Sequence, residues 1–92
     1  MTDKQFQIYT DTQNWIVGLP GWILDLVESY DFANLGKKTI VCTITLVSGF
    51  EITGYSSPVK LEDFNEDLGT ILAKRKVLEE LISLERYKAF TK

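Results

Sequence analysis

The sequence predicts a small α+β domain, and three features lead to this prediction. Residues 39–47 are rich in β-branched side chains and are followed by Ser48-Gly49 and a second alternating stretch, residues 50–56, a pattern typical of an antiparallel β-hairpin. Two apolar stripes run along residues 68–84, as expected of a long amphipathic helix. Shorter helical patterns precede the hairpin. We therefore expect N-terminal helices, one antiparallel β-hairpin and a long C-terminal helix packed on it, assembled as an oligomer.

The chain is expected to form a single domain over residues 1–92, with a helical part in residues 1–36 and the hairpin and long helix in residues 37–92. Of its 92 residues, 45% are hydrophobic and 25% are charged, which are ordinary values for a folded protein. A domain of this size buries only about two-thirds of the surface of its unfolded chain. Association with further copies would add stability, so we expect a homo-oligomer, either a dimer or a tetramer.

The N-terminal part is predicted to contain two helices separated by a break. Residues 3–17 have weak helical spacing, and "GLPG" follows them. In this break, Gly18 is expected to take the left-handed conformation that ends a helix, and Pro20 to start the next helix. That second helix is predicted over residues 22–30, with an apolar face made of Trp22, Ile23, Leu26, Val27 and Tyr30. Residues 31–38 are predicted to be a connection.

The hairpin is the best-defined element of the sequence. Alternation along its first strand assigns one face to the core, namely Ile40, Cys42, Ile44 and Leu46. On the return strand, Phe50, Ile52 and Gly54 share a face, and Tyr55 lies on the opposite one. Because a two-stranded hairpin is marginal in water, we expect both of its edges to be covered by helices or paired with another subunit.

The long helix is predicted to begin at a capping box formed by Asp63 and Glu66 and to run to about Glu85. The glycines of the hairpin are predicted to have different roles. Gly49 supplies the positive φ of a tight turn. Gly54 has no turn to make and is predicted either to form a bulge or to let the long helix approach closely, at Gly69.

Composition excludes several classes of function. The net charge of −3 and the pI near 4.8 argue against binding to duplex nucleic acid, which usually requires a basic face. The longest apolar run is too short for a transmembrane helix, so we expect a cytoplasmic protein without a membrane partner. The chain has no histidine and a single cysteine, Cys42, which we expect to be a buried small hydrophobe. We therefore expect no metal site, no cofactor and no enzymatic activity.

Six residues are candidates for binding a small anionic ligand. Aromatic rings stack on nucleobases, and hydroxyl groups with nearby cations hold phosphates. The residues of these types that fall near predicted loops and the long helix are Tyr9, Tyr55, Ser56, Ser57, Lys74 and Arg75. The simpler interpretation of the cations, a solvated helix face, remains open. The other large aromatic residues are expected in the core: Trp15, Trp22, Phe32, Phe50 and Phe64.

Residues 40–87 also carry a family resemblance. The pattern is a cysteine, a leucine, a turn ending in Gly-Phe, a Gly-x-Ser, a Phe-Asn helix start, a Leu-Gly, an alanine and a closing Leu-Glu-x-Tyr. In this sequence it falls on Cys42, Leu46, Gly49, Phe50, Gly54, Ser56, Phe64, Asn65, Leu68, Gly69, Ala73, Leu84, Glu85 and Tyr87. The stretch resembles a family of small phage proteins named after gene products forty-nine and sixty-six of two enterobacterial phages. Arg86 and Ile82 depart from the pattern, where the family has glycine and tryptophan.

The resemblance implies a phage or prophage accessory protein acting in the host cytoplasm. It also implies a similarity to phage sponges, oligomers that sequester the cyclic nucleotide signals of anti-phage systems such as CBASS or Thoeris and so evade host immunity. A cyclic dinucleotide bound without degradation is therefore the expected ligand, held by the six residues named above. The alternative is a phage early protein-interaction module that inhibits a host protein.

Overall fold

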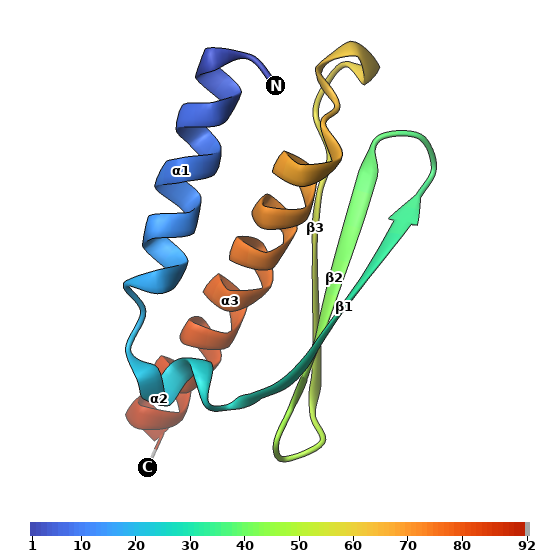
Figure 1. The fold of residues 1–92 in the computed structure, drawn as a ribbon. Helices are drawn as coiled ribbons and strands as arrows, with labels where there is room; N and C mark the ends of the chain where they lie inside the picture. Colours follow the sequence, from blue (N-terminus) through green and yellow to red (C-terminus); the bar gives the residue numbers. More distant parts are fainter. Residues whose placement is uncertain (92) are drawn as a thin grey trace.

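The computed structural model describes residues 1–91, with side chains described through Lys88. Its elements, in chain order, are α1 (Asp3–Val17), α2 (Gly21–Leu24), β1 (Val27–Leu35), β2 (Thr39–Leu46), β3 (Glu51–Ser56), the short 3-10 helix η1 (Leu61–Asp63) and α3 (Glu66–Thr91). Figure 1 shows α3 between α1 and the sheet, with α1 and α3 running in the same direction. The domain is thus α+β, as predicted.

The three strands form one antiparallel sheet in the order β1-β2-β3. The central strand, β2, alternates as predicted: Ile40, Cys42, Ile44 and Leu46 are buried beneath α3. The opposite face of the sheet carries hydroxyl-bearing side chains, including Thr43 and Thr53, whose oxygens are 3.0 Å apart across β2 and β3. The core therefore lies between the sheet and α3.

The prediction that Gly54 admits the long helix is confirmed, although the contact is not at Gly69. A Cβ atom at Gly54 would lie 2.8 Å from the backbone nitrogen of Val77, in the middle of α3. Gly69 instead faces the Ile40 side chain, which a Cβ there would approach to 3.0 Å. Gly49 has the predicted positive φ, 90°, in the β2–β3 turn. The backbone of α3 thus lies directly against β3.

The predicted helix over residues 22–30 is wrong, as is the connection over residues 31–38. The α-helix ends at Leu24, and Val27–Leu35 forms the edge strand β1, so the sheet has a third strand and residues 1–36 are not wholly helical. Val27, Tyr30 and Phe32 all favour strands, and β2, apolar on its inner face and half-buried on its outer face, gains a second neighbour from them. A turn with Gly36 at φ 72° joins β1 to β2.

Smaller errors occur at the helix ends. Gly18 ends α1 with φ −79°, which is right-handed rather than left-handed. The capping residue of α3 is Asn65, whose Oδ1 accepts from the Leu68 N–H at 3.0 Å, whereas Asp63 closes η1. The predicted capping box at Asp63 and Glu66 is therefore two residues too early. The helix also continues past Glu85 to Thr91.

The aromatic residues are less buried than expected. Trp22, Phe32 and Phe50 are exposed, and Trp15 and Phe64 are only half-buried. The core is built instead from aliphatic side chains together with Cys42, which is fully buried as predicted. An aliphatic core of this size leaves the large rings at its margins.

The helix α1 is confirmed with the predicted bounds and is fixed at both ends. A capping box that the sequence interpretation missed joins Thr2 and Gln5, whose side chains accept from each other's backbone N–H at 3.1 and 3.0 Å. Gln5 also donates from Nε2 to the carbonyl of Asp63 at 2.9 Å, and Ile16 near the C-terminal end joins the core. These contacts hold α1 along α3.

Candidate functional site

A groove of about 730 Å³ lies between α1, α3 and the outer edge of β3. We call it the β3 groove. Its apolar lining includes Ile8 from α1, Phe64, and Leu68 and Leu72 from α3. Tyr55, Ser56 and Ser57 line its sheet side, as do Thr53 and Pro58. Its volume falls within the range of about 300–1,000 Å³ typical of small-molecule sites.

Arg75 is the cation most firmly held in the β3 groove. Its guanidinium lies 4.6 Å from the centre of the Trp15 ring, and its Nε lies 3.5 Å from Glu79 Oε1. These two contacts orient the guanidinium between α1 and α3. The neighbouring Lys76 also lines the groove and is exposed. Two cations therefore lie within reach of a ligand there.

The predicted Tyr-Ser-Ser segment lines the groove, but its members have different surroundings. Tyr55 is 63% exposed on the face opposite the core, as predicted. Ser56 is half-buried, and its hydroxyl donates to the carbonyl of Gly69 at 2.6 Å. Ser57 is exposed, and its Oγ accepts from the Thr39 hydroxyl at 3.0 Å. Tyr55 and Ser57 are thus more accessible to a ligand than Ser56, whose hydroxyl joins β3 to α3.

The outer edge of β3 adds backbone donors to the groove. The Leu46 N–H donates to the Phe50 carbonyl at 2.8 Å, and residues of an antiparallel ladder alternately face the partner strand and face away. With Gly54 paired to Cys42, the N–H groups of Thr53 and Tyr55 point away from β2. Neither the sequence motifs nor the charge pattern identified these donors, because they follow from β3 being an edge strand.

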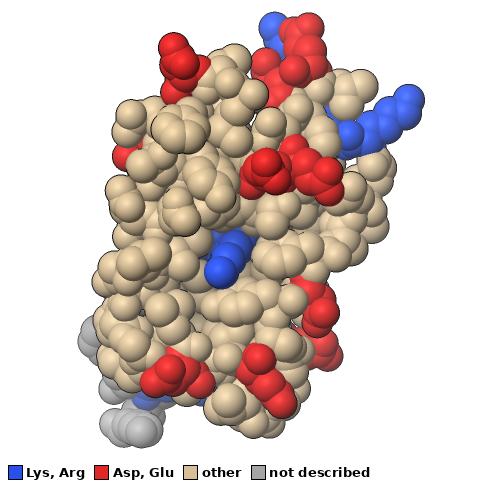
Figure 2. All heavy atoms as spheres, in the orientation of Figure 1, with Lys and Arg blue, Asp and Glu red and all other residues tan. Residues whose placement is uncertain are grey.

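Lys74 and Tyr9, the other two predicted residues, lie in a different hollow of about 340 Å³ between α1 and α3. The Lys74 ammonium lies 4.5 Å from the centre of the Tyr30 ring, on β1. We call the hollow between α1 and α3 the Lys74 hollow. Figure 2 shows, on one face of the molecule, a basic side chain set in a hollow near the middle, with acidic side chains above it, to one side of it and below it. The structure therefore separates Lys74 from Arg75, since consecutive helix residues point in different directions.

The charges around the β3 groove are mixed. Asp63, Glu79 and Glu80 line it together with Arg75 and Lys76. Lys38 donates to the carbonyl of Val59 at 2.8 Å. A groove with this balance favours a ligand of few charges over a polyanion, because the carboxylates partly offset the cations.

Two side chains of the described residues, Cys42 and Tyr30, have shifted pKa values. Burial raises the pKa of the Cys42 thiol to about 11, despite an opposing effect of Lys74, so the thiol is neutral at physiological pH. Burial also raises the pKa of Tyr30, with a smaller contribution in the same direction from Cys42. Among residues 1–88 no cluster of His, Cys, Asp or Glu is arranged to hold a metal ion. Within the described part of the chain, no helix is long and apolar enough to cross a membrane.

Several residues of the family pattern described in the sequence line the β3 groove. The comparison with protein families supports the same resemblance. The model of the phage protein (N4 Gp49/phage Sf6 gene 66) family matches residues 12–92. The chain belongs to this family. No curated protein and no solved structure matches the chain. The family match begins within α1, so it includes α2 and β1, which the resemblance found from the sequence did not reach.

Many of the residues that carry the family pattern form the joint between β3 and α3. Gly54 admits the backbone of α3, Ser56 donates to Gly69, and Asn65 caps the helix. Cys42 and Ala73 are fully buried beside them. The pattern therefore describes how the helix is seated on the sheet, and the groove lies along one side of this joint.

Proposed function

We propose that this member of the phage family binds a cyclic dinucleotide of bacterial anti-phage signalling, of the CBASS type, and sequesters it in the host cytoplasm without degrading it. The observation that supports this function most is the β3 groove, where Arg75, Lys76 and Tyr55 gather around an apolar lining. Its size suits one small ligand, and its exposed tyrosine offers a stacking surface for a base.

The proposed contacts divide between the two sides of the groove. Arg75 and Lys76 would hold the phosphates from α3, with the N–H groups of Thr53 and Tyr55 as further donors from the edge of β3. The Tyr55 ring would stack on a base, and Ser57 would add a hydroxyl contact. Binding without turnover suits a groove whose lining contains no histidine and no reactive thiol.

Calorimetry with a panel of cyclic dinucleotides tests this function. Arg75→Gln is expected to weaken binding by about tenfold to a hundredfold, the effect of losing one hydrogen bond to a charged group. Arg86→Gln is the matched control, because Arg86 lies on the same helix and does not line the groove. The absence of binding heat across the panel would overturn the proposal, as would equal affinity of the Arg75→Gln and Arg86→Gln variants.

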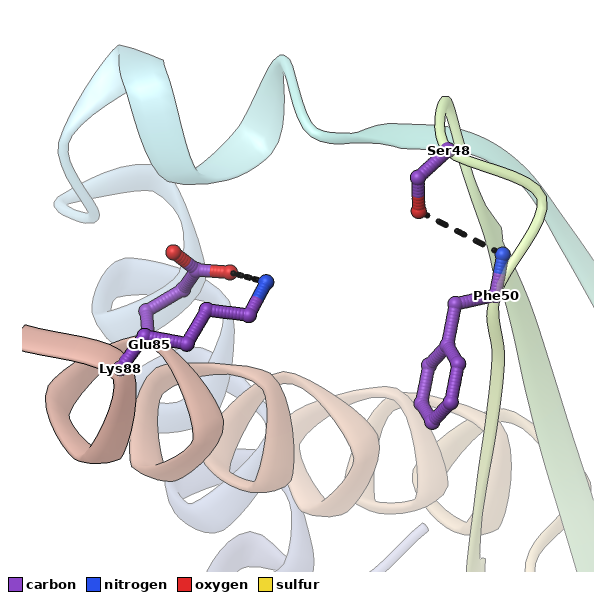
Figure 3. A network of polar contacts seen from close by, with 4 residues as sticks. All are labelled: Ser48, Phe50, Glu85 and Lys88. Atoms are coloured by element: carbon purple, nitrogen blue, oxygen red, sulfur yellow. Dashed lines mark hydrogen bonds and ion pairs between the residues drawn. The ribbon is translucent and has the colours of Figure 1, made fainter. Parts of the chain in front are cut away.

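A different surface supports the alternative, a protein-interaction module that inhibits a host protein. Trp22, Val47 and Phe50 are each more than half exposed, at the end of the molecule that carries α2 and the β2–β3 turn. Figure 3 shows Phe50 reaching from this turn towards α3, where Glu85 and Lys88 form an ion pair at 3.1 Å. Capture of one stoichiometric host protein, lost in a Trp22→Ser variant, would favour this alternative if no cyclic dinucleotide binds.

A further inference from the structure

We propose that a second copy of this chain pairs with the free edge of β1, so that two sheets join into one six-stranded antiparallel sheet around a two-fold axis near Phe32. This interface lies on the opposite side of the sheet from the β3 groove. It therefore does not depend on whether a ligand binds in that groove.

The β1 edge has unpaired backbone groups along its length. Residues 40, 42, 44 and 46 of β2 direct their backbone groups to β3, so residues 39, 41, 43 and 45 direct theirs to β1. Their partners on β1 are Ser29, Asp31, Ala33 and Leu35. The N–H and C=O groups of Tyr30, Phe32 and Asn34 therefore point outward, and within the described residues no other strand pairs with them.

This edge has a β-bulge between Val27 and Ser29 and two carboxylates, Glu28 and Asp31, which are features that discourage pairing, but from Ser29 to Leu35 its register is regular. Residues 27–35 contain no proline and no lysine, and β1 is the longest strand of the sheet. Phe32 pairs with the buried Cys42 and therefore lies on the face of the sheet that α3 covers over β2 and β3. Its side chain is nevertheless 43% exposed. The helix packs over β3 and β2 and leaves the inner face of β1 largely open.

A second copy is the partner that this edge fits best. With Phe32 opposite Phe32 of the second copy, Tyr30 lies opposite Asn34, Asp31 opposite Ala33, and Ser29 opposite Leu35. No carboxylate then faces another carboxylate, and the central pair is aromatic, a favourable cross-strand combination. The strand is thus complementary to itself in this register.

The other edge does not admit the same pairing. The backbone of α3 lies directly over β3 at Gly54, and paired strands lie about 4.8 Å apart, so pairing through β3 would bring two copies of α3 far closer than the 8–10 Å that packed helices need. With α3 taken over β3 in the same way, pairing through β1 leaves five strand spacings, roughly 24 Å, between the two helices.

The paired arrangement also creates a shared surface. The open inner faces of the two β1 strands would form the floor of a trough between the two copies of α3. Phe32 and Lys74 from each copy would line this trough, since the Lys74 ammonium already lies over Tyr30 of β1. The second copy would thus bring two copies of Lys74 and Phe32 to one two-fold symmetric surface that a single chain lacks.

Sedimentation equilibrium of the ligand-free protein tests this pairing. The wild type is expected to sediment at twice the chain mass of 10.5 kDa or more. Phe32→Lys is expected to reduce the mass at least twofold, because two lysines would face each other at the axis. Phe50→Lys is the control, because Phe50 is 60% exposed and lies in the turn just before β3. This variant is expected to keep the wild-type mass. A monomeric wild type, or a Phe32→Lys variant with the wild-type mass, would overturn the pairing.

Disulfide cross-linking provides a second test that does not require the lysine variant to fold. Directly opposite residues in a hydrogen-bonded antiparallel pair have Cα atoms about 5.5 Å apart, within reach of a disulfide. Phe32→Cys is expected to cross-link into dimers on mild oxidation, whereas Phe50→Cys is expected to stay monomeric on a denaturing gel. The native Cys42 is fully buried and does not compete. Equal cross-linking of the two variants would contradict the register.

Discussion

The two edges of the sheet are built differently. At β3 the backbone of α3 lies against Gly54, and the joint is closed by the hydrogen bond from Ser56 to Gly69. At β1 the helix contributes little more than the Lys74 side chain over Tyr30, and Phe32 stays exposed. Among the described helices, α3 packs most extensively on the sheet, and it covers β3 and β2. The helix is therefore seated on β3 and leaves β1 largely uncovered, and β1 is the edge that we propose for association.

The largest change in stability is expected where α3 lies against β3 at Gly54, because there is no room for an added methyl group. Gly54→Ala is expected to lower the free energy of unfolding by about 3 kcal/mol, because the new Cβ would overlap the backbone of Val77 and force α3 away from β3. Urea denaturation measures this change. Gly21→Ala is the control, since a Cβ there has nothing within 4 Å, and it should change the free energy by less than about 0.5 kcal/mol. Equal effects would mean that the helix is not seated on Gly54.

The central strand should show a pH dependence that comes from Cys42. Its pKa is about 11 in the folded protein against 9.0 for an exposed thiol, so the folded state disfavours the thiolate. The stability is therefore complete below pH 9 and falls as the pH rises towards 11, by about 2 kcal/mol. Thermal denaturation from pH 8 to pH 11 is the measurement. A Cys42→Ala variant should lose this component, and an identical pH profile in the variant would contradict the assignment.

The joint between β3 and α3 should be weakened moderately by loss of one hydroxyl. Ser56→Ala removes the donor to the Gly69 carbonyl and is expected to cost about 1 kcal/mol of unfolding free energy. Ser57→Ala serves as the matched control, because its hydroxyl makes only an exposed contact with Thr39. A larger loss for Ser57→Ala than for Ser56→Ala would show that the joint is held elsewhere.

Substitutions beside β1 should change the free energy of unfolding least. Lys74→Gln is expected to cost about 0.5 kcal/mol through loss of the contact with the Tyr30 ring. In a Tyr30→Leu background the same substitution should have almost no effect, because the ring is already absent. A double-mutant cycle by urea denaturation measures the difference. A coupling near zero would show that Lys74 does not stabilise β1.

The same contrast separates what the sequence predicts from what it does not. The β2–β3 hairpin and α3 follow from alternation, a Gly turn and apolar stripes, and the structure confirms them. The strand β1 was predicted as part of a helix because Ile23, Leu26, Val27 and Tyr30 also fit helical spacing. The half-buried outer face of β2 and the turn at Gly36, which show that β2 has a neighbour on each side, are visible only in the structure.

The candidate site was predictable only in part. Tyr55, Ser57 and Arg75 line one groove, as the sequence suggested for residues near the hairpin end and the long helix. Lys74 and Tyr9 lie in another hollow, since the direction of each residue around α3 depends on where α1 packs. Trp15, which orients Arg75, was assigned to the core, and its role follows from the placement of α1 rather than from any local pattern.

Recovery of the ligand tests the central claim, that the protein holds a cyclic dinucleotide without turning it over. The purified protein is incubated with each cyclic dinucleotide, separated from free ligand, denatured and analysed by mass spectrometry. Sequestration predicts that one of these ligands is retained and released intact, and that the Arg75→Gln variant retains much less of it than Arg86→Gln. Release of a linear or hydrolysed product, or retention of none of the ligands, would contradict the claim.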